Sequence, residues 1–240
     1  MRNHASALLQ TGKVNQLAAG TGRGEILRRD FFQRDPLSCA RDLIGCELNW
    51  NSCAGLIVET EAYNAIGDEA CHCFVRPSTR AFVERNRAGA AYVYFNYGVH
   101  WMLNVLVKGE EHGFVLIRAL EPTRGIALMR KRRDVHDVHR LCSGPGKLTQ
   151  ALAITGRYDE MDLCGNENHC FRRPAASFNV VADERIGIRR SAHLPWRFTL
   201  RDSAHVSRKV RSLAGETERS RRGTIKRAEH GQATPEDTSG

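Results

Sequence analysis

Residues 91–120 read AYVYFNYGVHWMLNVLVKGEEHGFVLIRAL, and this stretch decides the fold class. It contains three runs rich in Val, Ile, Leu, Phe and Tyr, at residues 91–97, 101–107 and 114–120, and these residue types favour β-strands. Only residues 98–100 separate the first two runs, which is the length of a hairpin turn. The stretch therefore predicts a mostly antiparallel sheet.

Helical patterns and shorter strands flank this stretch. Asp35 followed by Pro36 is typical of a helix start, and apolar residues then recur at helical spacing until Gly45. Further elements are predicted at these positions: helices after Pro122 and at residues 147–154, and strands at residues 55–58, 185–188 and 196–200. Strands and helices that share one chain without an internal linker predict a single α+β domain.

The two ends of the chain differ from its middle. Residues 1–28 show no sustained periodicity and predict a flexible arm, with a targeting peptide as the alternative because basic residues outnumber acidic ones there. From residue 207 to residue 240 apolar residues nearly vanish while basic residues accumulate, which predicts a disordered basic tail. We therefore place the domain at residues 29–206.

Composition narrows the class of protein. The chain has 240 residues, a formal net charge of +9 and 41% hydrophobic residues, which excludes a fibrous or wholly disordered protein. We expect a soluble intracellular protein without a membrane partner, because neither a span of ~20 apolar residues nor an export signal occurs. The eight cysteines are then expected as reduced thiols. Residues 121–240 carry 23 basic and 15 acidic side chains, so the predicted partner is a polyanion, with nucleic acid favoured.

Glu59 and Glu61 follow a buried-looking apolar run. Alternation along a strand places both carboxylates on one face, where they form either a solvated edge or a catalytic pair. Arg118 lies within the apolar run at residues 114–120, and an arginine there needs a carboxylate, a phosphate or a polar pocket as partner. Glu61 or Glu59 is the obvious candidate. The sequence thus predicts a carboxylate and arginine centre.

Three further features carry possible chemistry. Cys71, His72 and Cys73 could begin a zinc site, but no second half with suitable spacing occurs, so no metal is predicted. Tyr97 lies at the expected hairpin tip, where a ring has no core to fill and can stack on or wedge between nucleobases. The segment from Ser143 to Lys147 opens a helix and can bind an anion, or is only a turn. Together these features favour an enzyme that acts on nucleic acid.

Several longer blocks resemble the alkyladenine (3-methyladenine) DNA glycosylase family. The matching blocks, in collinear order, are LSCARDLIGCEL at 37–48, IVETEAY at 57–63, DEACH at 68–72, YVYFNYG at 92–98, Asn104, VLIRALEP at 115–122, LCSGPGKLTQALAI at 141–154 and RIGI at 185–188. The resemblance covers about residues 31–206. It implies a single mixed domain around a curved antiparallel sheet with flanking helices.

The resemblance also implies roles for the catalytic residues. Glu61 would be the general base that activates a water molecule for attack on the deoxyribose C1′ atom. Arg118 and the backbone carbonyl of Ile186 would help to hold that water.

The remaining site residues follow from the same resemblance. Tyr63 and Tyr94 would stack on opposite sides of the flipped base, His72 would read its edge, and Asn104 would exclude ordinary guanine. Tyr97 would fill the gap left in the duplex. The backbone contacts to DNA would come from Ser143, Gly146 and Lys147.

The expected function is therefore that of a monofunctional DNA glycosylase in base excision repair. It would flip out and release 3-methyladenine, hypoxanthine or ethenoadenine from double-stranded DNA, as a monomer without a cofactor. Its expected location is at DNA, in the nucleus of a eukaryote or the nucleoid of a bacterium. Two alternatives remain: a nucleic-acid-binding protein without catalysis, and a metal-dependent hydrolase built on Cys71, His72 and Cys73.

Overall fold

Strand β2 (Cys53–Asn64) organises the sheet, because three other strands pair with it. In the computed structural model, which describes residues 24–174 and 176–210, β5 pairs along the length of β2. Strand β1 pairs with the first residues of β2, and β8 pairs with residues 59–61. The sheet has eight strands in the order β3-β4-β5-β2-β1-β6, with β8 against β2 and β7 against β8, and every pair is antiparallel.

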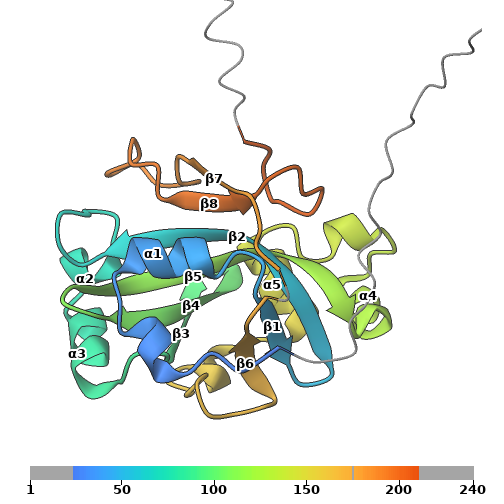
Figure 1. Cartoon of the computed structure of the whole chain (residues 1–240), viewed down its shortest axis with the longest axis horizontal. Coiled ribbons are helices and arrows are strands. Elements are labelled where there is room, and N and C mark those ends of the chain that lie inside the picture. Colours follow the sequence, from blue (N-terminus) through green and yellow to red (C-terminus); the bar gives the residue numbers. More distant parts are fainter. Residues whose placement is uncertain (1–23, 175, 211–240) are drawn as a thin grey trace, which may run out of the picture.

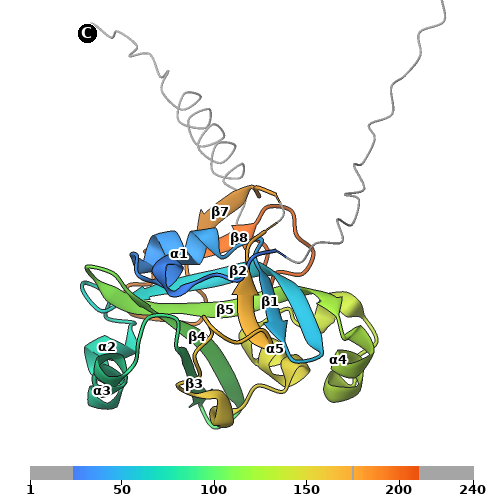
Figure 2. The ribbon, with the colours of Figure 1, turned by 60° about the horizontal axis from the view of Figure 1, so that its bottom comes forward.

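The other elements surround this sheet (Figure 1). The strands are β1 (Glu47–Trp50), β3 (Ala91–Asn96), β4 (His100–Lys108), β5 (His112–Arg124), β6 (His169–Arg172), β7 (Val180–Asp183) and β8 (Arg197–Leu200). The helices are α1 (Pro36–Asp42), α2 (His72–Val75), α3 (Pro77–Arg85), α4 (Ile126–Arg133) and α5 (Pro145–Leu152), with 3-10 turns at Arg29–Phe32, Val138–Arg140 and Gly156–Tyr158. Helices α2 and α3 lie at one end of the sheet and α4 at the other. Figure 2 shows β3 and β4 turning away from the plane of β2, so the sheet is curved. The expected α+β fold around a curved antiparallel sheet is confirmed.

Helix α1 covers one face of the sheet. The Asp35 carboxylate accepts a hydrogen bond from the Ser38 amide at 2.8 Å and caps the helix, as the sequence predicts. The Thr60 hydroxyl donates to the Ala40 carbonyl of α1 at 2.8 Å. Because neighbouring side chains of a strand point to opposite faces, Glu59 and Glu61 lie on the face turned away from α1.

Some predicted boundaries differ from the structure. The predicted strand at 55–58 lies in the first half of the much longer β2, so Glu59 and Glu61 lie inside a strand rather than after its end. Residues 185–188 are not a strand, and this prediction is wrong. Gly187 has φ +78°, a left-handed conformation that breaks an extended run. The neighbouring strand is β7, which ends at Asp183.

The ends of the chain lie partly outside the described residues. The predicted arm falls mainly on residues 1–23 and the predicted tail mainly on residues 211–240, neither of which the structure describes. The described part of the arm lies against β6, where Leu27 is buried and its amide donates to the Phe171 carbonyl at 2.8 Å. Within the described ranges, no helix has the length and apolar character needed to cross a membrane.

Candidate active site

A cavity of about 640 Å³ opens on the face of the sheet that faces away from α1. Strands β2, β3, β4 and β5 contribute its floor and walls, and residues 186–190 form a further wall. All five residues predicted for the base pocket line it: Tyr63, His72, Tyr94, Asn104 and Ile186. Arg118 and Tyr97 line it as well. Residues from widely separated blocks of the sequence therefore meet in one cavity.

Glu61 is fully buried beside this cavity and receives a donor on each oxygen. The Tyr63 hydroxyl donates to Oε2 at 2.7 Å, and the Ile186 amide donates to Oε1 at 2.7 Å. Arg118 Nη1 lies 3.1 Å from Oε2. Burial, followed by the Glu61 carboxylate, holds the pKa of Tyr63 well above its usual range, so this hydroxyl stays a donor. The carboxylate is thereby held in one orientation.

Arg118 is shared between two carboxylates. Its Nε atom donates to Glu59 Oε1 at 2.9 Å, while its Nη1 atom faces Glu61. Burial by itself would lower the pKa of Arg118, but the charges of Glu61 and Glu59 outweigh it and the pKa is raised. Both carboxylates that the sequence offers as partners of Arg118, Glu59 and Glu61, therefore bind it.

Glu59 anchors a second layer of the same cluster. Arg197 Nε donates to Glu59 Oε1 at 2.9 Å, and Arg197 also reaches Asp183 at 3.0 Å. The Ser207 amide and hydroxyl donate to the two oxygens of Glu59 at 2.6 and 2.7 Å. Burial would raise the pKa of Glu59, but Arg118 and Arg197 outweigh it and hold that pKa below its usual value. Glu59 is therefore a charged structural partner of Arg118.

His72 and the aromatic rings form the far wall of the cavity. The His72 ring lies 4.6 Å from the Tyr94 ring, and its Nδ1 atom lies 3.1 Å from the Tyr92 hydroxyl. Burial, together with the charge of Arg76, lowers the pKa of His72 to about 4. Burial raises the pKa of Tyr94 to about 12. At neutral pH this wall is uncharged and aromatic.

Tyr97 and Asn104 occupy contrasting positions. Tyr97 is 91% exposed at the tip of the β3–β4 hairpin, with φ +49°, a left-handed conformation that is strained for a tyrosine. Asn104 is buried, and its side chain donates to the Tyr92 carbonyl at 3.2 Å. The tyrosine thus projects outward while the asparagine is fixed on the cavity floor.

The loop before α5 lies beside the hairpin. Lys147 Nζ donates to the Ser143 hydroxyl at 3.4 Å, and both side chains remain accessible to solvent. A Cβ atom on Gly146 would come within 2.6 Å of the His100 ring, so this position needs glycine for close packing. Pro145 lines the cavity. The structure therefore places Ser143, Gly146 and Lys147 at the rim rather than inside the cavity.

Four residues of this site have no role assigned from the sequence. Arg197 and Ser207 follow no recognisable spacing; β8 and the segment after it bring them to Glu59 only after the chain has folded. Arg185 and Asp68 form a buried ion pair at 2.6 Å although 117 residues separate them. The available signal was that Asp68 and Arg185 begin two of the quoted blocks, DEACH and RIGI.

Among the described residues, Cys71, His72 and Cys73 have no further ligands that would complete a metal centre. Both cysteines are buried, and the part of the chain that the structure describes contains no group of three or more His, Cys, Asp or Glu side chains placed to hold a metal ion. His72 instead faces the cavity. The arrangement can orient a buried carboxylate toward a ligand that enters the aromatic cavity.

Comparison with known proteins gives one family. The model of the methylpurine-DNA glycosylase family matches residues 30–204. A protein of Rhodopseudomonas palustris strain BisB18, provisionally named a 3-methyladenine DNA glycosylase, is 46% identical over 196 residues, which is 80% of this chain and 96% of that protein. Proteins of the same provisional name from Bradyrhizobium diazoefficiens and Agrobacterium fabrum are 42% and 44% identical, over 77% and 75% of this chain and 92% of each relative.

Proposed function

Because the chain belongs to the methylpurine-DNA glycosylase family and is thus a DNA glycosylase, we propose that it releases 3-methyladenine, hypoxanthine and ethenoadenine from double-stranded DNA. The observation that carries this proposal is the fixed orientation of Glu61 beside a cavity that has an uncharged aromatic wall. The enzyme leaves an abasic site and an unbroken strand.

Glu61 is the general base in this proposal. It takes a proton from a water molecule as the water oxygen bonds to the deoxyribose C1′ atom, and the bonding pair of the C1′–N bond leaves with the base. Arg118 balances the charge of the carboxylate at 3.1 Å. The Ile186 carbonyl adds a further acceptor for the water. A base that already carries a positive charge leaves readily, whereas a neutral lesion also needs a proton.

The cavity selects the base in two ways. The rings of Tyr63 and Tyr94 stack on it, and a cationic purine gains from electron-rich rings. His72 is uncharged at neutral pH and does not repel such a purine, since its pKa lies at about 4. The buried Asn104 excludes the extra amino group of guanine.

DNA must be distorted for this chemistry. A base in the stack is out of reach, so the nucleotide rotates outward at a cost of a few kcal/mol, which is lower for damaged pairs. The exposed ring of Tyr97 can occupy the vacated space. Ser143, Gly146 and Lys147 at the rim hold a phosphate near the helix start.

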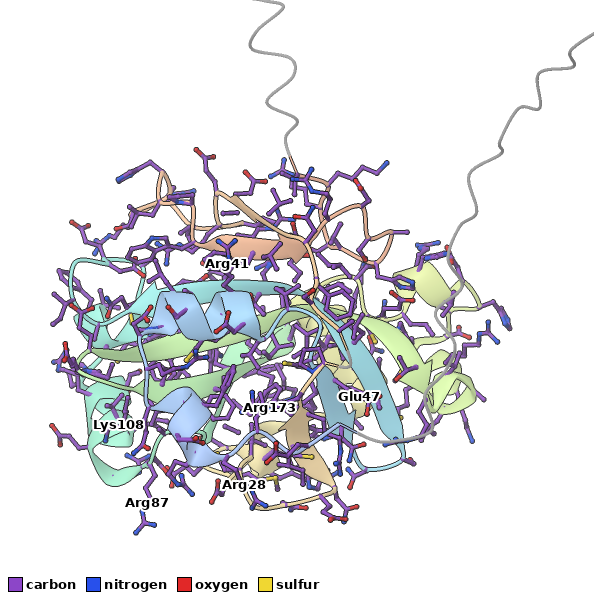
Figure 3. The ribbon with its side chains drawn as sticks, viewed as in Figure 1. Arg28, Arg41, Glu47, Arg87, Lys108 and Arg173 are labelled. Carbon is purple, nitrogen blue, oxygen red and sulfur yellow. The ribbon has the colours of Figure 1, made fainter. Side chains whose placement is uncertain are left out.

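The test is single-turnover base release from duplexes that carry each of the three lesions. Glu61→Gln should reduce the rate about 10²- to 10⁴-fold, the usual contribution of a general base. Glu47→Gln removes the same charge from strand β1, at a residue that does not line the cavity and is labelled in Figure 3. It should leave the rate unchanged. Equal rates for the wild type and Glu61→Gln would refute the role of Glu61. A folded wild type that binds DNA but releases none of the bases would be a binding protein instead.

A further inference from the structure

The loop at residues 185–191 forms one wall of the cavity and is exposed to solvent on its other side. Five consecutive residues of this loop line the cavity: Ile186, Gly187, Ile188, Arg189 and Arg190. The loop has no regular secondary structure. Its shape is nevertheless defined, because Gly187 and Ser191 both adopt positive φ angles, of +78° and +49°.

Arg185 fixes this loop to the body of the protein. Its buried guanidinium forms two hydrogen bonds with Asp68, at 2.6 and 2.8 Å, and a third with the Ala62 carbonyl of β2 at 2.9 Å. It also donates to the Ser191 carbonyl at 3.1 Å, so one side chain joins both ends of the loop. A buried and bidentate pair of this kind imposes a defined geometry.

The same guanidinium is packed between two aromatic rings. It lies 4.7 Å from the centre of the Tyr63 ring and 5.1 Å from that of Trp196. At the next position, the Ile186 amide donates to Glu61. The loop is therefore a preformed wall whose position relative to Glu61 is fixed. The same contacts hold the end of the loop that is exposed to solvent.

Arg189 and Arg190 are the exposed charged residues of this wall. Neither side chain has a hydrogen bond or an ion pair within residues 24–174 and 176–210. Some partly exposed arginines of the described residues pair with an acid, as in Arg29–Asp162 at 2.6 Å, while Arg41 and Arg87 do not. Arg189 and Arg190 differ from the latter because they are adjacent and line the cavity. Two adjacent guanidinium groups repel each other, and an anion that lies between or beside them relieves that repulsion.

We propose that Arg189 and Arg190 bind backbone phosphates of the damaged strand next to the nucleotide that enters the cavity. This proposal rests on the proposed function, since it takes DNA as the ligand. Arginine suits the role because its planar group forms paired hydrogen bonds with phosphate oxygens. The contact is separate from that of Ser143, Gly146 and Lys147, because it comes from a different loop.

The test compares two double variants that lose the same charge. Arg189→Ala/Arg190→Ala removes the proposed contacts, while Arg41→Ala/Arg87→Ala removes two exposed arginines that do not line the cavity and are labelled in Figure 3. Binding to an undamaged duplex and to a duplex with a lesion is measured over a range of salt concentrations. Single-turnover base release is measured at saturating enzyme.

The Arg189→Ala/Arg190→Ala variant should bind both duplexes about tenfold or more weakly near 0.1 M salt. The slope of its binding constant against salt should fall by about 0.9 for each lost phosphate contact. The Arg41→Ala/Arg87→Ala variant should keep the wild-type slope. Equal slopes for the two variants would overturn the proposal. A wild type that releases no base would count against the proposed function alone, because the binding measurements do not depend on release.

Discussion

Glu59 balances two buried arginines at once, so the charge of the whole cluster depends on it. Glu59→Gln leaves Arg118 and Arg197 without that carboxylate, and breaking a buried pair costs about 3–5 kcal/mol in the free energy of unfolding. Ser207→Ala removes only one hydrogen bond to the same carboxylate and should cost about 1 kcal/mol. Urea denaturation measures both. A Glu59→Gln protein as stable as the wild type would contradict the charged state of Glu59.

The same variant should show a defined pH dependence. The pKa of Glu59 is lowered in the folded protein, so its stabilising effect is present above the usual glutamate value of 4.5 and is lost as the pH falls through the folded pKa. The difference in unfolding free energy between wild type and Glu59→Gln should therefore narrow below pH 4.5. A constant difference would show that the charge does not matter.

His72 should stay uncharged throughout the physiological range. Burial is the first cause of its lowered pKa, at about 4, and Arg76 is the second. An unfolded chain would bind this proton near pH 6.5, so His72 lowers the stability of the fold as the pH falls from about 6.5 to about 4. A titration by NMR should give an apparent pKa near 4 for His72. A midpoint near 6.5 would mean that His72 faces solvent.

Helix α1 offers a test at the scale of one element. Its first turn depends on Asp35, whose carboxylate accepts the Ser38 amide, so Asp35→Ala should lower the unfolding free energy by about 1 kcal/mol. Asp35→Asn keeps an acceptor at the cap and should cost less. Thermal and urea denaturation compare the two. Equal losses would indicate that charge, and not the hydrogen bond, stabilises the helix start.

Elements with strong local signals could be predicted from the sequence, and elements set by distant contacts could not. Strands β3, β4 and β5 carry long apolar runs, and α1 has a cap and a stop signal. The four-residue strand β6 is too short for a periodic pattern. The loop at 185–188 looks like a strand because Ile186 and Ile188 alternate, yet its conformation is fixed by Arg185 and a partner 117 residues away.

The candidate site shows the same limit. Glu61 and Arg118 could be proposed because charged residues within apolar runs need partners. The resemblance of the blocks supplied the roles of Tyr63, His72 and Asn104. Neither route could find Arg197. It reaches Glu59 only because β8 pairs with β2, with Arg197 opposite Glu61.

At the scale of the whole molecule, the two faces of the sheet have different roles. One face packs against α1, while the other holds the cavity and its carboxylates. Figure 3 shows the α1 side with Arg28, Arg41 and Arg173 among its labelled side chains. Positive charge is thus not confined to the cavity side, and only matched variants can separate a specific DNA contact from net charge.

Two truncations test the end of the described chain. Ser207 binds Glu59, and Arg197 donates to the Arg208 carbonyl, so the domain needs residues up to 208. Residues 211–227 carry six basic and two acidic side chains, and we expect them to add sequence-independent DNA affinity. A chain that ends at residue 210 should therefore bind DNA more weakly, with a flatter salt dependence and an unchanged single-turnover rate.

A second truncation shows whether the domain boundary is correct. A chain that ends at residue 206 also loses Ser207, so it should be less stable by about 1–3 kcal/mol and should release base more slowly, because Glu59 and Arg118 lose a shared partner. Stability comes from urea denaturation and the rate from single-turnover release at saturating enzyme. If both truncated chains behaved alike, Ser207 would have no part in holding Arg118 beside Glu61. An unchanged salt slope in the chain that ends at 210 would instead remove residues 211–240 from DNA binding.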